Sequence, residues 1–307
     1  MNFFKTVLAN WRHAAAIGHL LIAATLLGQS HALAESEFKV GTCDWTLRMG
    51  ADVEAFYFAE RVGLKGIQFT FGAAGEGLDL RTRANRDLFR QTIKRTGVAC
   101  SSLGIGRLNK IPLASTDEGE QLVVDCIAAM ALLQTESAEF NDPDFAARVS
   151  PQIVLLAFFN KGDINGQPAL IESVITKLKR LAPMAESHGL TLGLETRLCE
   201  ADHRYILESV DSPALKVFYD VANSASMGYD IYAELESLGT DNICQIHLKE
   251  MKALLGNGSI DFPRIKGILK TMDYQGWLIL EGATPKGMDR LEASKANATY
   301  ALELFGR

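Results

Sequence analysis

Short apolar segments typical of β-strands alternate with longer amphipathic segments along most of this chain of 307 residues. The strand-like segments are rich in β-branched and aromatic residues and lie between turn-forming residues. They cover residues 38–43, 66–71, 99–104, 153–159, 191–195, 215–220, 243–248 and 277–281. This alternation constrains the fold most, because strands that are separated by helices join parallel sheets.

The segments between the strands carry helix signals. Asp52 supplies a carboxylate at the start of the first, and Gly97 and Gly189 follow the ends of two others. The expected helices cover residues 52–62, 85–95, 119–133, 168–188, 202–210, 229–238, 262–272 and 288–304. The pattern predicts a (β/α)8 barrel, with a doubly wound open sheet as the alternative. No G-x-G-x-x-G motif follows an early strand, which counts against the open sheet.

One segment, residues 134–150, fits this pattern badly. It is polar, contains the turn-forming run Asn141-Asp142-Pro143-Asp144, and is longer than a usual connection. Loops of that length are often functional or mobile, but nothing in this one indicates a role. Since no linker, repeat or low-complexity stretch interrupts the chain, we expect residues 35–307 to form one barrel domain.

The first 34 residues have the features of a secretory signal. Lys5 and Arg12 precede an apolar run at residues 14–27, and Ala32-Leu33-Ala34 is a small-x-small cleavage site. The apolar run is shorter than the ~20 residues of a membrane span, and an uncleaved N-terminal anchor is the alternative. We therefore expect cleavage near Ala34 and export to the periplasm or the exterior.

The charge balance bears on partners. Loss of residues 1–34 removes Lys5 and Arg12 and takes the basic count from 31 to 29 against 37 acidic residues, a net charge of −8. An acidic chain without a Lys/Arg cluster argues against nucleic acid and, after signal cleavage, against a membrane as partner. A homo-oligomer is compatible with the sequence.

Five cysteines lie in or beside apolar segments, and we predict mostly buried thiols rather than a disulfide framework. They are Cys43, Cys100, Cys126, Cys199 and Cys244.

Four strand-like segments end on side chains that bind metal ions. Glu195 lies in GLET, Asp220 in FYDVAN, His247 in IHLKE and Glu281 in LILEG. A strand-end carboxylate alone is more often a helix cap, and a single histidine more often a core residue. Their occurrence on four successive strands, whose ends meet at one mouth of a barrel, predicts a divalent-cation site instead. An oxygen-dominated site favours Mn²⁺, with Mg²⁺, Co²⁺ or Zn²⁺ as alternatives.

The histidines sharpen this prediction. His188 at a helix end and His203 in a first helical turn are expected to be solvated, and three others fall within residues 1–34. His247 alone lies on a barrel strand. A multi-histidine zinc cluster and a basic groove, which an endonuclease would need, are therefore not expected.

The chain resembles the xylose-isomerase-like TIM-barrel superfamily, the sugar phosphate isomerase/epimerase group. The resemblance is densest in LLAFFNKGD, LGLET, YDVANSASMGYDIY, IHLKE, LLGNGSIDFPRI and GWLILEGATPKGM. It implies one cation held by Glu195, Asp220, His247 and Glu281. It also implies that the two glutamates are catalytic and remove and return a proton at a sugar carbon.

This assignment is chemically sensible, because a hydrogen next to a carbonyl is too weakly acidic for an unaided carboxylate. A cation that stabilises the resulting enediolate makes removal of this hydrogen feasible. The sequence therefore predicts a divalent-metal-dependent isomerase or epimerase acting on a carbohydrate or polyol. A lyase or hydratase on keto-sugars or 3-keto-glycosides at the same site is the alternative, and a non-catalytic sugar-binding barrel is less favoured.

Five further residues are candidate substrate contacts. Lys249 lies on the same strand face as His247, and Lys161 follows the fourth strand. Trp45 follows the first strand and offers an aromatic ring for stacking on a sugar, with a plain core role as the alternative. Asn223 stands where many members of the group carry a histidine. Ala201 occupies the position of a further glutamate, with Glu200 one residue earlier. The last two departures bear against ketose epimerisation in its usual form and leave the metal set complete.

Overall fold

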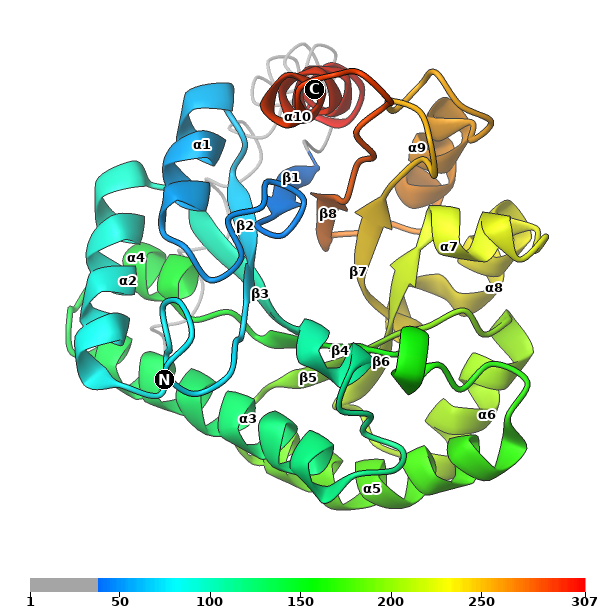
Figure 1. The fold of residues 1–307 in the computed structure, drawn as a ribbon, viewed down its shortest axis with the longest axis horizontal. Helices are drawn as coiled ribbons and strands as arrows, with labels where there is room; N and C mark the ends of the chain where they lie inside the picture. Colours follow the sequence, from blue (N-terminus) through cyan, green and yellow to red (C-terminus); the bar gives the residue numbers. More distant parts are fainter. Residues whose placement is uncertain (1–37, 307) are drawn as a thin grey trace, which may run out of the picture. The chain divides into compact units, whose positions relative to one another are not determined.

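Eight parallel strands pair in chain order, and the eighth closes on the first (Figure 1). The computed structural model describes residues 38–306. The strands are β1 Lys39–Cys43, β2 Gly66–Thr70, β3 Ala99–Ile105, β4 Ile153–Ala157, β5 Thr191–Glu195, β6 Leu215–Asp220, β7 Ile243–Leu248 and β8 Trp277–Leu280. The predicted (β/α)8 barrel is confirmed, whereas the predicted signal at residues 1–34 lies outside the described residues.

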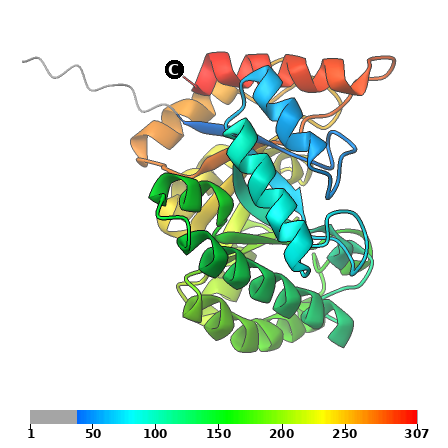
Figure 2. The same ribbon diagram turned by 90° about the vertical axis from the view of Figure 1, so that its left-hand side faces the viewer.

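Helices cover the outside of the barrel, with α1 beside α2 and α3 beside α5 (Figure 2). They are α1 Glu54–Val62, α2 Arg83–Thr96, α3 Asp117–Ala138, α4 Pro143–Val149, α5 Pro168–Ser187, α6 Glu200–Val210, α7 Val221–Ser226, α8 Ile231–Asn242, α9 Phe262–Thr271 and α10 Arg290–Phe305. Two 3-10 turns, η1 Gly106–Asn109 and η2 Asn160–Gly162, follow β3 and β4. Gly97 ends α2 with φ 70°, a left-handed conformation that glycine adopts without steric cost.

The segment 134–150 is not the long loop that its composition indicates. Helix α3 extends to Ala138, and α4 begins where the Asp142 side chain accepts a hydrogen bond from the Phe145 amide at 2.9 Å. Phe145 and Val149 are buried, and α4 packs against α2, α3 and β3. A carboxylate cap followed by proline at the first helical position explains this helix.

The core lies mainly between the barrel and its helices, and a smaller apolar cluster inside the barrel contains Leu155, Ala157 and Phe218. All five cysteines are free; Cys199 and Cys244 are half-buried and the other three are buried, as predicted. Within residues 38–306 no helix is both long and apolar enough to cross a bilayer. Since all eight strands are parallel, their carboxyl ends meet at one mouth of the barrel, where the candidate ligands lie.

Candidate metal centre

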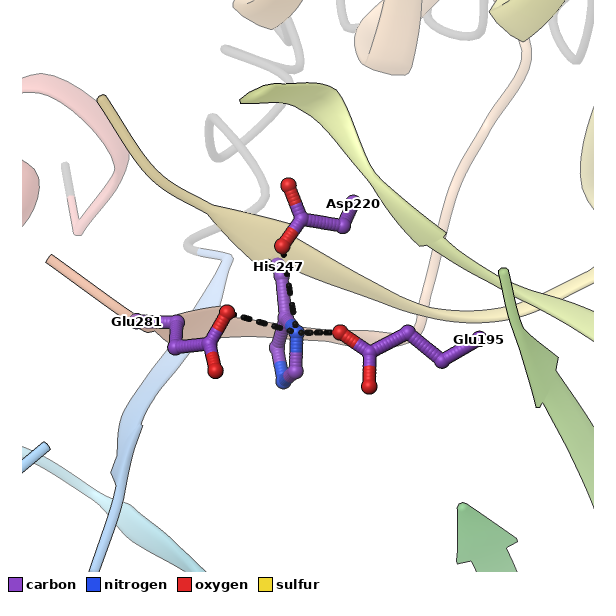
Figure 3. Close-up of side chains that lie close together, drawn as sticks. All are labelled: Glu195, Asp220, His247 and Glu281. Carbon is purple, nitrogen blue, oxygen red and sulfur yellow. Dashed lines mark hydrogen bonds and ion pairs between the residues drawn. The ribbon is translucent and has the colours of Figure 1, made fainter. Parts of the chain in front are cut away.

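The four predicted ligands come together at the carboxyl mouth of the barrel (Figure 3). Glu195 and Asp220 end β5 and β6, His247 lies near the end of β7, and Glu281 follows β8. One ligand atom from each lies within 4.8 Å of the ligand atoms of the other three. Glu195, Asp220 and His247 are buried, and Glu281 is half-buried.

His247 Nδ1 is at the centre of this group. It lies 2.9 Å from Glu195 Oε1, 3.7 Å from Asp220 Oδ2 and 3.7 Å from Glu281 Oε2. Divalent cations bind such atoms at about 2.0–2.3 Å, so ligands around one cation lie roughly 3–4 Å apart. The spacing and the three-oxygen, one-nitrogen donor set therefore fit a divalent cation.

Asp220 is both a helix cap and a candidate ligand. Its Oδ1 accepts hydrogen bonds from the amides of Ala222 and Asn223, each at 2.8 Å, and so begins α7. Its Oδ2 faces His247. The two interpretations of this residue in the sequence are compatible, because a carboxylate has two oxygens; the cap fixes the orientation of the second.

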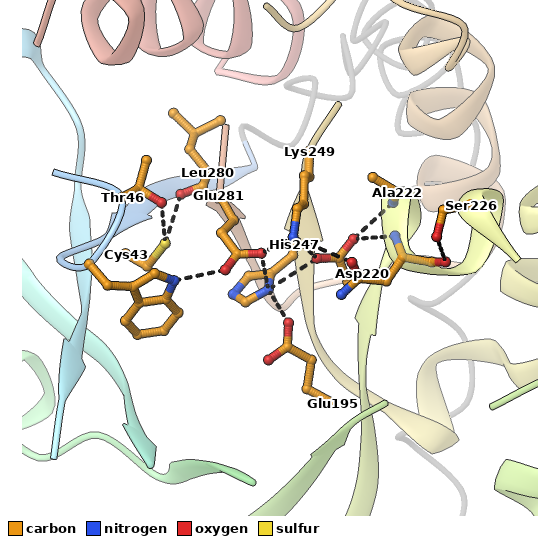
Figure 4. Close-up of polar contacts among 12 residues, drawn as sticks. Cys43, Thr46, Glu195, Asp220, Ala222, Ser226, His247, Lys249, Leu280 and Glu281 are labelled. Carbon is orange, nitrogen blue, oxygen red and sulfur yellow. Dashed lines mark hydrogen bonds and ion pairs between the residues drawn. The ribbon is translucent and has the colours of Figure 1, made fainter. Parts of the chain in front are cut away.

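Each carboxylate oxygen of Glu281 accepts a hydrogen bond (Figure 4). Trp45 Nε1 donates to Oε1 at 2.8 Å, and Lys249 Nζ donates to Oε2 at 2.7 Å. Lys249 Nζ also lies 3.4 Å from Asp220 Oδ2 and 3.3 Å from Asn223 Oδ1. Trp45, Lys249 and Asn223, predicted as substrate contacts, thus lie at the centre, where Trp45 and Lys249 orient Glu281.

Burial and neighbouring charges shift the pKa values of three of the candidate ligands. Burial disfavours charged His247, but Glu195, Asp220 and Glu281 outweigh burial and raise the pKa of His247 to about 10. Burial raises the pKa of Glu195, against the opposing effect of His247. Burial opposes ionised Asp220, yet Lys249 and His247 hold the pKa of Asp220 below its ordinary value.

The pKa of Lys249 is shifted in the same way. Burial disfavours its charge, but Asp220 and Glu281 raise the pKa of Lys249 above its ordinary value. The protein's own cations, His247 and Lys249, therefore balance the carboxylates. A bound divalent cation would compete with both for the same oxygens.

The remaining predicted substrate residues lie differently. Lys161 is exposed on η2, in the connection that follows β4. Glu200 begins α6, where its side chain accepts hydrogen bonds from Arg204 and from Ser237 Oγ. These partners lie on α6 and α8, so the described contacts of Glu200 join two outer helices rather than the four ligands.

The prediction for His203 is wrong, and that for His188 is confirmed. His188 is exposed, whereas His203 is 3% exposed and its Nε2 lies 2.9 Å from Thr196 Oγ1. Burial lowers the pKa of His203 to about 4. The first turn of α6 faces the barrel at this position, which the sequence pattern alone did not reveal.

Gln68 was missed by sequence reasoning. It lies on β2, is fully buried, and its Oε1 is 2.7 Å from His247 Nε2. The signal was present, because Gln68 is a polar residue in the middle of the apolar segment GIQFT. Its partner, 179 positions away, was not visible in the sequence.

Comparisons with known proteins agree with the barrel fold. The family model described as "Xylose isomerase-like TIM barrel" matches residues 56–304. The chain is 26% identical over 215 residues to a 2-epi-5-epi-valiolone 7-phosphate 2-epimerase of Actinoplanes sp., a match that covers 69% of this chain and 72% of that protein.

Two further similarities are shorter or more distant. An inosose dehydratase of Halalkalibacterium halodurans is 26% identical over 135 residues, which cover 34% of this chain and 43% of that protein. A crystal structure of D-psicose 3-epimerase with D-fructose superposes with a TM-score of 0.68 at 13% identity. That superposition covers 88% of this chain and all of the other chain, and it shows the shared fold.

Proposed function

The chain belongs to the xylose isomerase-like TIM barrel family, and from this premise we propose that it is a divalent-metal-dependent sugar isomerase or epimerase. One observation carries the proposal: Glu195 and Glu281 approach His247 Nδ1 from opposite sides, as Figure 3 shows. Two carboxylates that flank one site can remove a proton from one face of a carbon and return it to the other.

Glu195, Asp220, His247 and Glu281 would hold the cation, with Mn²⁺ favoured by the oxygen-rich donor set. When bound, the cation would stabilise the negative charge that develops on the substrate as a proton next to a carbonyl is removed. The ligand atoms that face one another at 2.9–3.7 Å support this assignment.

The protein's own groups then divide the work. Glu195 and Glu281 would act as base and acid, and Lys249 with Trp45 would hold the Glu281 carboxylate in one orientation through bonds to its two oxygens. Lys249, Asn223 and Trp45 would also contact the substrate, since they surround the ligands. Lys161 would do so from the connection after β4.

We also propose that the enzyme acts outside the cytoplasm, after cleavage near Ala34. The barrel's first strand begins at Lys39, so that cleavage would leave every strand in the mature chain. Sugar phosphates are mainly cytoplasmic, and a free sugar or polyol is therefore the favoured substrate. Mass measurement of the exported protein would test the cleavage site.

The direct test is metal-dependent exchange with solvent. The mature protein is stripped with chelator, given Mn²⁺ in deuterated buffer, and incubated with a panel of free ketoses, 3-keto-glycosides and inositols. We expect deuterium incorporation or product that needs Mn²⁺ and is lost in Glu281→Gln. Tight Mn²⁺ binding without exchange on any of these substrates would refute the isomerase proposal and favour a sugar-binding role.

A lyase or hydratase is the second candidate, favoured by the similarity to an inosose dehydratase. Both reactions begin with removal of the same proton, and only the fate of the resulting anion differs. The same incubation separates them, because elimination gives a product that has lost water, whereas epimerisation gives an isomer that keeps its water and gains mass only by taking up deuterium.

A further inference from the structure

A buried hydrogen bond lies behind the metal centre. His247 points Nδ1 toward the three carboxylates, and on the other side of its ring Nε2 lies 2.7 Å from Gln68 Oε1. Gln68 and His247 are both fully buried. The ring of Phe218 also packs against His247 in a T-shaped contact, with centroids 4.6 Å apart. The imidazole is therefore held through its edge and its ring.

The identity of the atoms matters. A neutral imidazole carries one proton, and a ring that binds a cation through Nδ1 must carry that proton on Nε2. The amide oxygen of Gln68 is an acceptor only, so it holds a proton on Nε2, and the proton that a cation displaces is the one on Nδ1, which faces the carboxylates. Partners of this kind fix both the tautomer and the orientation of histidine ligands.

The hydrogen bond to His247 offsets part of the free-energy cost of burying the Gln68 amide. Among the described residues, the Gln68 side chain has one hydrogen-bond partner, His247, and its Nε2 atom has none. Burying an amide whose nitrogen is unpaired costs free energy. Gln245, on β7, is buried to the same extent with neither side-chain polar atom bonded, and it provides a matched comparison.

From this geometry we infer that Gln68 is a positioning residue that holds His247 with its proton on Nε2 and its Nδ1 available to a divalent cation. The inference rests on the proposed function of the four ligands. Loss of the Gln68 oxygen would leave the buried Nε2–H without an acceptor and would free the ring to turn or change tautomer. Removal of such partners weakens metal binding by about 10–100-fold.

Three variants of the mature protein test this role. Gln68→Met keeps the length of the side chain and removes the acceptor, Gln68→Glu keeps an acceptor at the same place, and Gln245→Met removes the unbonded amide. Mn²⁺ affinity is measured by the electron paramagnetic resonance of free Mn²⁺, and melting temperatures are recorded for each protein. With ¹⁵N-labelled histidine and Mg²⁺, NMR then reports which nitrogen of His247 is protonated.

We expect Gln68→Met to bind Mn²⁺ about 10–100-fold more weakly and to lose the Nε2–H signal of His247. Gln68→Glu, which keeps an oxygen acceptor beside Nε2, should recover most of that loss, and Gln245→Met, which leaves Gln68 in place, should bind Mn²⁺ as the wild type does. Wild-type affinity in Gln68→Met, or an equal loss in Gln245→Met, would overturn the inference. If the wild type binds no Mn²⁺, the proposed function fails and the inference falls with it. If instead the wild type binds Mn²⁺ and Gln68→Met is unchanged, only the role of Gln68 is refuted.

Discussion

Binding of Mn²⁺ near pH 7.5 should release about one proton from His247, because the cation and the proton compete for Nδ1. The three carboxylates raise the pKa of His247 to about 10. At pH 7.5 more than about 99% of such a group is protonated. Metal binding must therefore displace the proton from nearly every molecule.

The magnitude follows from the same pKa. Displacing a proton costs about 1.4 kcal/mol for each unit between the pH and the pKa, or about 3 kcal/mol at pH 7.5. The pKa lies above the pH, so this cost shrinks as the pH rises. The apparent Mn²⁺ affinity should thus increase about tenfold for each pH unit between about 7 and 9.

Titration calorimetry in buffers of different ionisation enthalpy measures the number of protons released. His247→Gln is the control, since an amide oxygen can bind the cation and carries no titrating proton; it should bind more weakly and release almost none. A wild-type heat that does not depend on the buffer, or an affinity that stays constant from pH 7 to 9, would refute the assignment of Nδ1 as a ligand.

Three further predictions concern stability and charge. Burial lowers the pKa of His203 to about 4, so the unfolded state binds more protons below about pH 6.5, and the free energy of unfolding should fall by about 2 kcal/mol between pH 7 and pH 5. The melting temperature of His203→Gln should depend less on pH than that of the wild type, and equal slopes would contradict this. Glu136, buried between Arg86 and Arg90, has a pKa lowered to about 2. Its contribution is present above about pH 4.5 and is lost as the pH falls toward 2; Glu136→Gln should cost about 3–5 kcal/mol in urea unfolding, and an unchanged midpoint would refute the role of this ion pair. Lys249→Met should tighten Mn²⁺ binding about tenfold, measured by the electron paramagnetic resonance of free Mn²⁺, since it removes the ammonium group 2.7 Å from Glu281 Oε2. Equal or weaker binding would show that Lys249 does not compete with the metal.

Much of the fold was predictable because it depends on local patterns. The strand-like runs around Glu195 and Asp220 end at the residues where β5 and β6 end. The segment 134–150 was predicted wrongly, since its polar composition hid the cap at Asp142 and the two buried residues that make α4 a helix. A short helix with few apolar residues is stabilised by its neighbours rather than by its own sequence.

The sequence by itself determined the barrel and the four candidate metal ligands. Parallel strands in chain order bring their carboxyl ends to one mouth, so residues that end successive strands must meet there. Only the tertiary structure decided how those ligands are held. Trp45 reaches Glu281 across 236 positions, and Gln68 reaches His247 across 179. Periodicity states which face of a strand a side chain occupies, whereas its partner across the barrel depends on strand closure, side-chain packing and exclusion of water.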